Sequence, residues 1–463
     1  MTEENSAPRH VAVIDIGKTN AKVALVDMAT LTEIAVRTRP NSVIRDGIYP
    51  HADCDALWLF LLESLKALHG EKQIDAISIT THAATAVLLK EDGALAMPVL
   101  DYEHNGPDGL TAAYDAVRPP FAETGTPRLP GGLNLGAQLF WQSKAFAELF
   151  ADVTSILMYP QYWSFRLTGV LASEVTSLGC HTDLWNPAKG DFSSLVDDLG
   201  WRGLFAPVRA ASDKLGSILP EIVESTGLDP ETPVYCGIHD SNASLLPHLL
   251  SRKAPFSVVS TGTWVIVMAM GGTLDRLDPS RDTLINVNAL GNPVPSARFM
   301  GGREYSTLTG DRQVEWTEED VKAVLQEQIM LLPSVQKGSG PFPDREAEWL
   351  NAQDISLAER YIAISFYLAL MTATCLDLVG ADGPIIVEGP FSKNKIFVSM
   401  LSAASERSVI SGNKTATGTS IGAALLTKFE KTTVENPASA ANEIHENFYN
   451  YKKVWFEKVR SKK

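Results

Sequence analysis

Two glycine-containing hairpin patterns, one in each half of the chain, constrain the fold more than any other feature of the sequence. The segment HVAVIDIGKTNAKVALVDM contains two β-rich runs, residues 11–16 and 21–26, joined by the polar residues GKTN. The segment PFSVVSTGTWVIVMAM, residues 255–270, repeats this plan with STGTW between two apolar runs. Short apolar runs joined by small polar residues predict β-hairpins. The repetition favours a duplicated architecture.

The elements that follow each hairpin pattern extend the repeat. Strands followed by alternating helices and strands are typical of layered α/β domains. In the first half the patterns predict a strand at 32–40, a helix at 55–69, two strands within 74–89, and helices near 137–150 and 158–167. In the second half they predict a strand at 234–238, a long apolar helix at 357–379, a strand and loop at 384–394, and a helix that starts near 418.

The length of the chain agrees with two domains. At 463 residues it exceeds what one ordinary hydrophobic core serves. We place the boundary near residue 245, between Asp240 and Ser257. No low-complexity linker separates the halves. We therefore expect a cleft lined by residues of both halves.

Composition and charge narrow the classes of partner. The chain is 45% hydrophobic and 21% charged, as in ordinary globular proteins, and its net charge is −15. This charge argues against nucleic acid and anionic membranes as main partners. No apolar run approaches the roughly 20 residues of a membrane span. The four cysteines show no CxxC spacing, so we expect reduced thiols in a cytoplasmic protein.

The first hairpin tip carries residues suited to a phosphate group. Glycine lets the backbone approach a phosphate closely, hydroxyls and amides donate to it, and a carboxylate can hold Mg²⁺ through water. Taken alone, the tip is equally compatible with an ordinary polar turn. The residues in question are Asp15, Gly17, Thr19, Asn20 and Lys22.

The second tip, with Thr261, Gly262 and Thr263, offers the same combination of hydroxyls and glycine. A nucleotide bound between two halves needs hydrogen-bond donors from both of them. Two matching tips therefore favour phosphate binding over two unrelated polar turns.

The segment GIHDSNAS places Asp240 after a predicted strand and before a predicted helix, in apolar surroundings. One interpretation is that Asp240 caps the helix. The alternative is a general base that takes a proton from a hydroxyl as its oxygen attacks a γ-phosphate. The neighbouring His239 could then bond the substrate.

Taken in chain order, these motifs resemble the FGGY family of carbohydrate kinases. Residues 237–244 are similar to the family's catalytic segment and residues 261–264 to its second phosphate motif. YWSFRLTGVLASEVTSLG is similar to its Y-x-x-x-R-L-T-G segment. The resemblance covers nearly the whole chain. The family's first phosphate motif, D-x-G-x-T-x-x-K/R, is matched by Asp15, Gly17, Thr19 and Lys22.

The resemblance implies an α/β fold of two ribonuclease H-like domains of the actin/hexokinase type. It assigns sugar and phosphate binding to residues 1–245 and nucleotide binding to residues 246–463. It also implies ATP and Mg²⁺ as cofactors, with Asp240 as the base and Asp15 holding Mg²⁺ through water. The further residues that it places on ATP are Thr263, Asn288, Gly389 and Asn394, and those on the sugar are His82, Ala83, Glu103 and His239.

The sugar-facing segments depart from the family pattern. THAATA replaces a GVDG-like segment, so Ala83 and Thr85 stand for Gly and Asp, and YEHNG puts His104 and Gly106 at the Asp and Arg positions of W-x-D-x-R. Elsewhere, His239 before Asp240 and the segment LINVNALG most resemble rhamnulokinases and, next, L-fuculokinases. We therefore predict phosphorylation of a small ketose, such as L-rhamnulose or L-fuculose, at a primary hydroxyl.

Two alternatives stay open at this point. One is a kinase for a linear polyol such as glycerol or erythritol. The other is a nucleotide-binding sensor that has lost catalysis. Because dimers are common among related kinases, a homodimer is a further open alternative.

Overall fold

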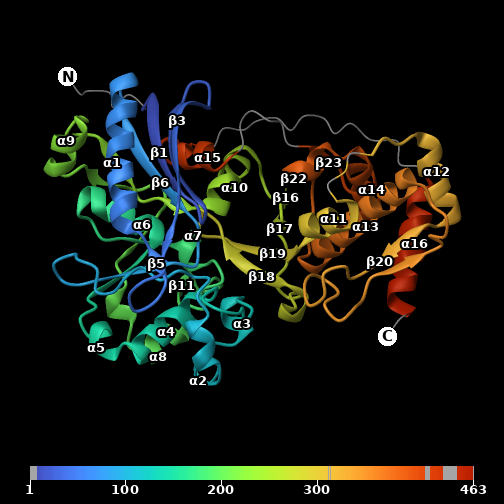
Figure 1. Ribbon diagram of the computed structural model, residues 1–463, viewed down its shortest axis with the longest axis horizontal. Coiled ribbons are helices and arrows are strands. Elements are labelled where there is room, and N and C mark those ends of the chain that lie inside the picture. The colour runs from blue at the N-terminus through green and yellow to red at the C-terminus, as the bar shows by residue number, and fades with distance from the viewer. Residues whose placement is uncertain (1–7, 311, 313, 412–417, 431–445, 462–463) are drawn as a thin grey trace. The chain divides into compact units, whose positions relative to one another are not determined.

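The computed structural model describes residues 8–310, 312, 314–411, 418–430 and 446–461, and divides the chain into two compact units (Figure 1). The first unit comprises Met1–Ser251, Ile285–Pro293 and Asn413–Thr433, and the second comprises Arg252–Leu284, Val294–Gly412 and Val434–Lys463. The main boundary lies a few residues beyond position 245. The return of two later segments to the first unit was not predicted.

The first unit is built on a seven-stranded sheet in which β1 and β2 form the predicted hairpin. Asp15 of β1 faces Lys22 of β2 in the register. The strand of residues 76–81 runs parallel to β1. In spatial order the strands are β13 (Lys214–Ser217), β14 (Pro233–Tyr235), β6 (Ala76–Thr81), β1 (His10–Ile16), β2 (Asn20–Asp27) and β3 (Thr32–Pro40), with β15 (Ile238–His239) also pairing β6.

Helices cover both faces of this sheet. Alternate residues of β6 show the two faces: Ile77 and Ile79 pack in an apolar cluster with α1 (Cys54–Glu71), whereas the Ser78 hydroxyl donates to the Ala423 carbonyl of α15 (Thr419–Leu425) at 2.7 Å. Figure 1 shows α1 and α15 on opposite sides of β1 and β6. The returning segment therefore completes the second layer.

Helix α10 (Asp240–Ser251) packs against α15 at very short range. A Cβ added to Gly422 would lie 1.7 Å from the Ala243 carbonyl oxygen, so only glycine fits there. This contact supports the helix that begins at Asp240.

The second unit repeats the strand order of the first. Its sheet runs β18 (Thr283–Val287), β19 (Pro293–Phe299), β17 (Val265–Met270), β16 (Phe256–Thr261), β22 (Ile385–Glu388) and β23 (Val409–Ser411). The end of β18, residues 285–287, and Pro293 of β19 are the part of this sheet that groups with the first unit. In both units an antiparallel hairpin is followed by strands parallel to its first strand: β1–β2 with β6 and β14, and β16–β17 with β22 and β23. The expected duplication of the strand plan is confirmed.

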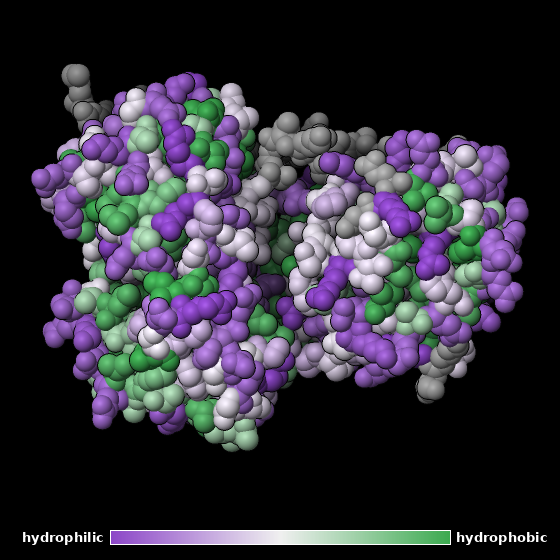
Figure 2. Space-filling view, in the orientation of Figure 1, coloured by the Kyte–Doolittle hydropathy of each residue, from purple (hydrophilic) through white to green (hydrophobic). Residues whose placement is uncertain are grey.

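Helix α13 (Leu357–Leu378) runs through the hydrophobic core of the second unit. Helix α13 is long and apolar enough to span a membrane, but 89% of its apolar stretch is buried inside the unit. It packs against α14 (Lys395–Ser405), while α16 (Glu446–Ser461) inserts Trp455 into the same core. Figure 2 shows hydrophilic side chains over much of the visible face, with hydrophobic ones in scattered patches.

Shorter elements complete the described part of the chain. The strands are β4 (Val43–Ile44), β5 (His51–Ala52), β7 (Ala86–Leu89), β8 (Ser155–Met158), β9 (Ser173–Glu174), β10 (Trp185–Asn186), β11 (Asp191–Phe192), β12 (Val208–Arg209), β20 (Met330–Leu332) and β21 (Glu348–Leu350). The helices are α2 (Thr111–Asp115), α3 (Phe121–Thr124), α4 (Leu135–Ala145), α5 (Ala147–Phe150), α6 (Tyr159–Thr168), α7 (Val175–Leu178), α8 (Ser194–Asp198), α9 (Pro220–Thr226), α11 (Gly301–Thr309) and α12 (Glu318–Glu327).

Candidate active site

The tip of the β1–β2 hairpin is a tight turn closed by its own backbone. The Gly17 amide donates to the Asn20 carbonyl at 2.9 Å, and the Asn41 side chain donates to the Gly17 carbonyl at 2.8 Å. Thr19 and Asn20 are exposed at the tip. Their polar groups are therefore open to a ligand, as the sequence predicted for a phosphate site.

Asp15 lies at the base of this tip beside Lys22. The Lys22 ammonium is 3.4 Å from an Asp15 carboxylate oxygen and 3.0 Å from Glu33. Burial raises the pKa of Asp15, Lys22 opposes this shift, and the charge of Asp240 adds to it. The charges of Asp15 and Asp240 therefore influence each other within the first unit.

Asp15 also has the donor chemistry that Mg²⁺ requires. Mg²⁺ usually keeps several waters and binds through one or two carboxylates together with substrate phosphates. Among the residues that the structure describes, no group of three or more His, Cys, Asp and Glu side chains could hold a metal by itself. A single carboxylate next to the glycine-containing hairpin tip fits an ion that is held mainly by water and nucleotide.

Asp240 stands where β15 ends and α10 begins, with its side chain one-third exposed. One carboxylate oxygen, Oδ1, lies 3.1 Å from His239 Nε2 and accepts the Ser241 amide at 2.6 Å. Burial would raise the pKa of Asp240, but the hydrogen bond and charge of His239 outweigh it and hold this pKa below its usual value. Asp240 is thus kept ionised with one oxygen fixed by the protein.

A buried chain of hydrogen bonds holds His239 in place. The Thr176 hydroxyl accepts the His239 amide at 3.0 Å and donates to the Glu174 carboxylate at 2.5 Å. Glu174 is fully buried, and burial raises its pKa to about 7. Sequence reasoning missed this support, although both side chains lie within the quoted segment YWSFRLTGVLASEVTSLG.

The predicted sugar contacts divide into two groups. The His239 side chain is 8% exposed and bonds Asp240, so it supports the carboxylate. His82 lines a narrow recess in the first unit, and its Nδ1 lies 2.9 Å from the carbonyl oxygen of the adjacent Ala83. Glu103 does not line this recess, but its carboxylate lies 3.3 Å from Lys18, which does. Lys18 was not predicted, because it occupies a variable position of the phosphate motif.

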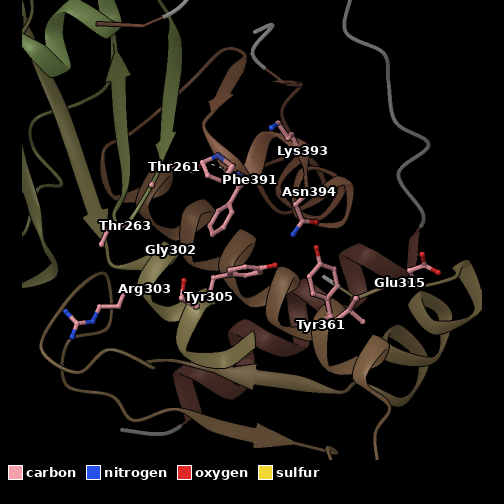
Figure 3. A pocket seen from close by; sticks show the side chains of 14 residues that line it. Thr261, Thr263, Gly302, Arg303, Tyr305, Glu315, Tyr361, Phe391, Lys393 and Asn394 are labelled. Carbon is pink, nitrogen blue, oxygen red and sulfur yellow. Dashed lines mark hydrogen bonds between the residues drawn. The ribbon is translucent and has the colours of Figure 1, made fainter. Parts of the chain in front are cut away.

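The second unit contains a separate pocket beside the β16–β17 tip, with a cavity volume of about 850 Å³. This volume is within the usual range for cofactor sites. Tyr305 stands between Tyr361 and Phe391, with ring centroids 6.4 and 5.6 Å away (Figure 3). The predicted residues that line the pocket are Thr261, Gly262, Thr263 and Asn394.

Close backbone packing shapes the rim of this pocket. A Cβ on Gly302 would lie 1.9 Å from the Gly262 carbonyl oxygen, and one on Gly389 would lie 1.9 Å from that of Thr261. The Thr261 hydroxyl accepts the Phe391 amide at 3.1 Å and donates to the Glu388 carbonyl. Gly389 therefore serves the pocket by allowing this approach.

Two side chains that were predicted to bind nucleotide make hydrogen bonds within the protein. Asn394 caps α14 by accepting the Phe397 amide at 3.1 Å and donates to Ser365 at 3.0 Å. Asn288 belongs to the first unit, is 3% exposed, and accepts the Leu290 and Asn292 amides of its own turn. The structure does not bring Asn288 into the second-unit pocket, because its side chain closes this turn.

A duplicated ribonuclease H-like sheet, with a glycine-containing hairpin tip in each unit, defines a protein of the actin/hexokinase fold class. Residues 10–247 match the FGGY family of carbohydrate kinases, N-terminal domain, and residues 253–436 match carbohydrate kinase FGGY, C-terminal domain. The chain belongs to the FGGY family of carbohydrate kinases. The resemblance seen in its motifs is confirmed.

Relatives that are named as sugar kinases resemble the chain at modest sequence identity. The chain is 27% identical over 276 residues to a probable L-xylulose kinase from Pasteurella multocida (strain Pm70), covering 57% of this chain and 56% of that protein. It is 28% identical over 279 residues to a rhamnulokinase from Yersinia pestis (strain Pestoides F), covering 57% and 54%. The chain therefore spans about half the length of these curated relatives.

A solved structure matches over the full length. A carbohydrate kinase from Novosphingobium aromaticivorans has 36% identity and a TM-score of 0.91, with 98% of this chain and 99% of that chain covered. The two-domain fold predicted from the sequence is thereby confirmed.

Proposed function

We propose that this protein transfers the γ-phosphoryl group of ATP to a primary hydroxyl of a small ketose. The observation that carries the proposal is the state of Asp240. It is an ionised carboxylate with one oxygen fixed by His239 and Ser241, and its unit also contains a phosphate-type turn. A helix cap alone would not need the buried support behind His239.

Asp240 acts as the general base in this proposal. Its second carboxylate oxygen takes the proton of the acceptor hydroxyl as that oxygen bonds to the γ-phosphorus. The bond between the γ-phosphorus and the β–γ bridging oxygen breaks, and ADP leaves. Since His239 holds Oδ1, the geometry favours proton transfer to Oδ2.

The second-unit pocket is proposed to hold the nucleotide. Its aromatic side chains, Tyr305, Tyr361 and Phe391, suit a flat base, and the exposed Gly262 and Thr263 suit the phosphates. The N-terminus of α11 begins beside this tip, where its backbone amides favour an anion. When bound, Mg²⁺ would neutralise phosphate charge, with Asp15 as its protein contact.

The acceptor is proposed to be a deoxyketose or a pentulose, such as L-rhamnulose or L-fuculose. Support comes from relatives named for ketose substrates, a rhamnulokinase and a probable L-xylulose kinase. Because the segments at 82–85 and 102–106 depart from the family pattern, a panel must decide among ketoses.

The test is ADP formation by the purified protein with Mg-ATP and a panel of acceptors. The panel contains L-rhamnulose, L-fuculose, both ribuloses, both xyluloses, erythrulose, erythritol and glycerol. We expect one ketose to stimulate ADP formation at least a hundredfold over the acceptor-free rate. Stimulation by a polyol alone would contradict the ketose assignment, and no stimulation with ATP still bound would favour a sensor.

A further inference from the structure

The recess beside the first hairpin tip is lined by an ion pair that joins distant parts of the first unit. Lys18 projects from the tip and bonds Asp101 in the loop after β7. Its ammonium also lies 3.3 Å from Glu103 and 4.7 Å from the centre of the Tyr102 ring. One cation therefore faces two carboxylates, and its charge is more than balanced.

A buried hydroxyl in this recess lacks a hydrogen-bond partner. The Thr85 side chain lines the recess and is 4% exposed, and its oxygen makes no hydrogen bond to any described residue. A buried hydroxyl without a partner destabilises the folded protein. Because this oxygen is shielded from solvent, a ligand hydroxyl would supply the partner only after the recess widens.

The recess has room for only a small group. Its cavity volume is about 20 Å³, the space of about one or two water molecules. It therefore admits one hydroxyl-bearing end of an acceptor, while the rest of the acceptor lies outside.

The carboxylates near this recess make its electrostatic potential negative. Burial, then the carboxylates of Glu103, Asp101 and Asp240, raises the pKa of Tyr102 to about 12. Burial also lowers the pKa of His82, so this ring adds no positive charge at neutral pH. An anionic group that enters the recess would meet uncompensated negative charge.

We propose that this recess binds the uncharged hydroxyl end of the acceptor and rejects a carboxylate, with the Lys18–Asp101 pair as the discriminating element. The paired ammonium donates to a hydroxyl and the paired carboxylate accepts from one. The proposal rests on the proposed function, because it assumes that the phosphoryl acceptor binds in the first unit. It assigns the acceptor to neutral ketoses and excludes aldonates.

Direct binding tests this selectivity without requiring turnover. Titration calorimetry on the full chain would compare D-xylulose with D-xylonate and L-rhamnulose with L-rhamnonate, which match within each pair in carbon number. We expect the better ketose to bind at least tenfold more tightly than its acid. Equal or tighter binding of the acid, or no binding of either class, would overturn the proposal.

Substitution of Asp101 tests whether the Lys18–Asp101 pair produces this selectivity. Asp101→Asn leaves Lys18 less neutralised, so we expect the ratio of ketose to aldonate affinity to fall at least fivefold. The control Glu91→Gln removes an exposed carboxylate from the turn after β7 and should leave this ratio unchanged. An unchanged ratio in a folded Asp101→Asn protein would overturn the role of the pair.

The outcome is separable from that of the kinase proposal. Ketose-selective binding without acceptor-stimulated ADP formation would refute the kinase and retain the recess. Rapid phosphorylation of an aldonate would refute the recess and retain the kinase.

Discussion

His239 Nε2 lies 3.1 Å from Oδ1 of Asp240, and this contact links the proposed base to the buried interior of the first unit. Behind the ring, the backbone amide of His239 is bonded by Thr176, which in turn bonds Glu174. The carboxylate is therefore positioned by groups that are buried in the first unit.

Replacing His239 should move the acid limb of the pH–rate profile. Asp240 must be ionised to accept a proton, and its pKa is held low by His239. Loss of the ring raises this pKa, so activity is lost at a higher pH as the solution is acidified. In His239→Ala we expect the acid limb of kcat/KM to move up by about one pH unit.

The conservative variant provides the control. His239→Gln keeps a side-chain donor without a titratable charge and should give a smaller shift. Coincident acid limbs in the wild type and both variants would show that His239 does not tune Asp240.

Glu174 should make stability depend on pH. Its pKa is about 7 in the folded protein against an ordinary value of 4.5, because burial disfavours the charged form. Between these two values the folded state binds a proton on Glu174 that the unfolded state has lost. The protonated Glu174 therefore stabilises the folded protein fully below pH 4.5, and this contribution is lost as the pH rises through 7. The loss is about 3 kcal/mol at most.

Glu174→Gln removes this titration. Denaturant unfolding at pH 5 and at pH 8 should show the variant gaining stability relative to the wild type as the pH rises. A difference in unfolding free energy that is the same at both values would contradict the raised pKa.

Gly389→Ala should damage the nucleotide pocket through a backbone clash. At φ +81° the added Cβ would lie 1.9 Å from the Thr261 carbonyl oxygen. We expect at least a tenfold loss of ATP affinity by calorimetry, because β16 and the loop after β22 must separate.

Gly338→Ala is the matched control for this substitution. Gly338 also has a positive φ, +72°, but a Cβ there would meet nothing within 4 Å. Its cost should be that of the backbone conformation alone, about 1 kcal/mol, with ATP affinity unchanged. Equal effects of the two variants would contradict the steric account.

The sequence predicted the local elements well because their signals are local. The hairpins at 10–27 and 256–270, the helix at 54–71 and the apolar helix at 357–378 are all confirmed within a few residues. Alternating apolar residues with glycine turns, and apolar residues at helical spacing, identify such elements without tertiary information.

The other features of the fold and of the site depend on contacts between residues that are distant in the sequence. Lys18 meets Asp101, 83 positions away, and Ser78 bonds Ala423, 345 positions away. No local pattern encodes such pairings. The family resemblance places Asn394 on the nucleotide, and the structure adds contacts that no local pattern shows: Asn394 lines the second-unit pocket, caps α14 and donates to Ser365.

The role of Asp240 as a base is tested most directly by acceptor-stimulated ADP formation in Asp240→Asn, measured beside ATP binding by calorimetry. The asparagine retains a side-chain oxygen for the Ser241 amide but cannot take a proton. The account predicts unchanged ATP affinity and a loss of turnover of about a thousandfold or more. A folded variant that turns over at the wild-type rate would show that Asp240 only caps α10.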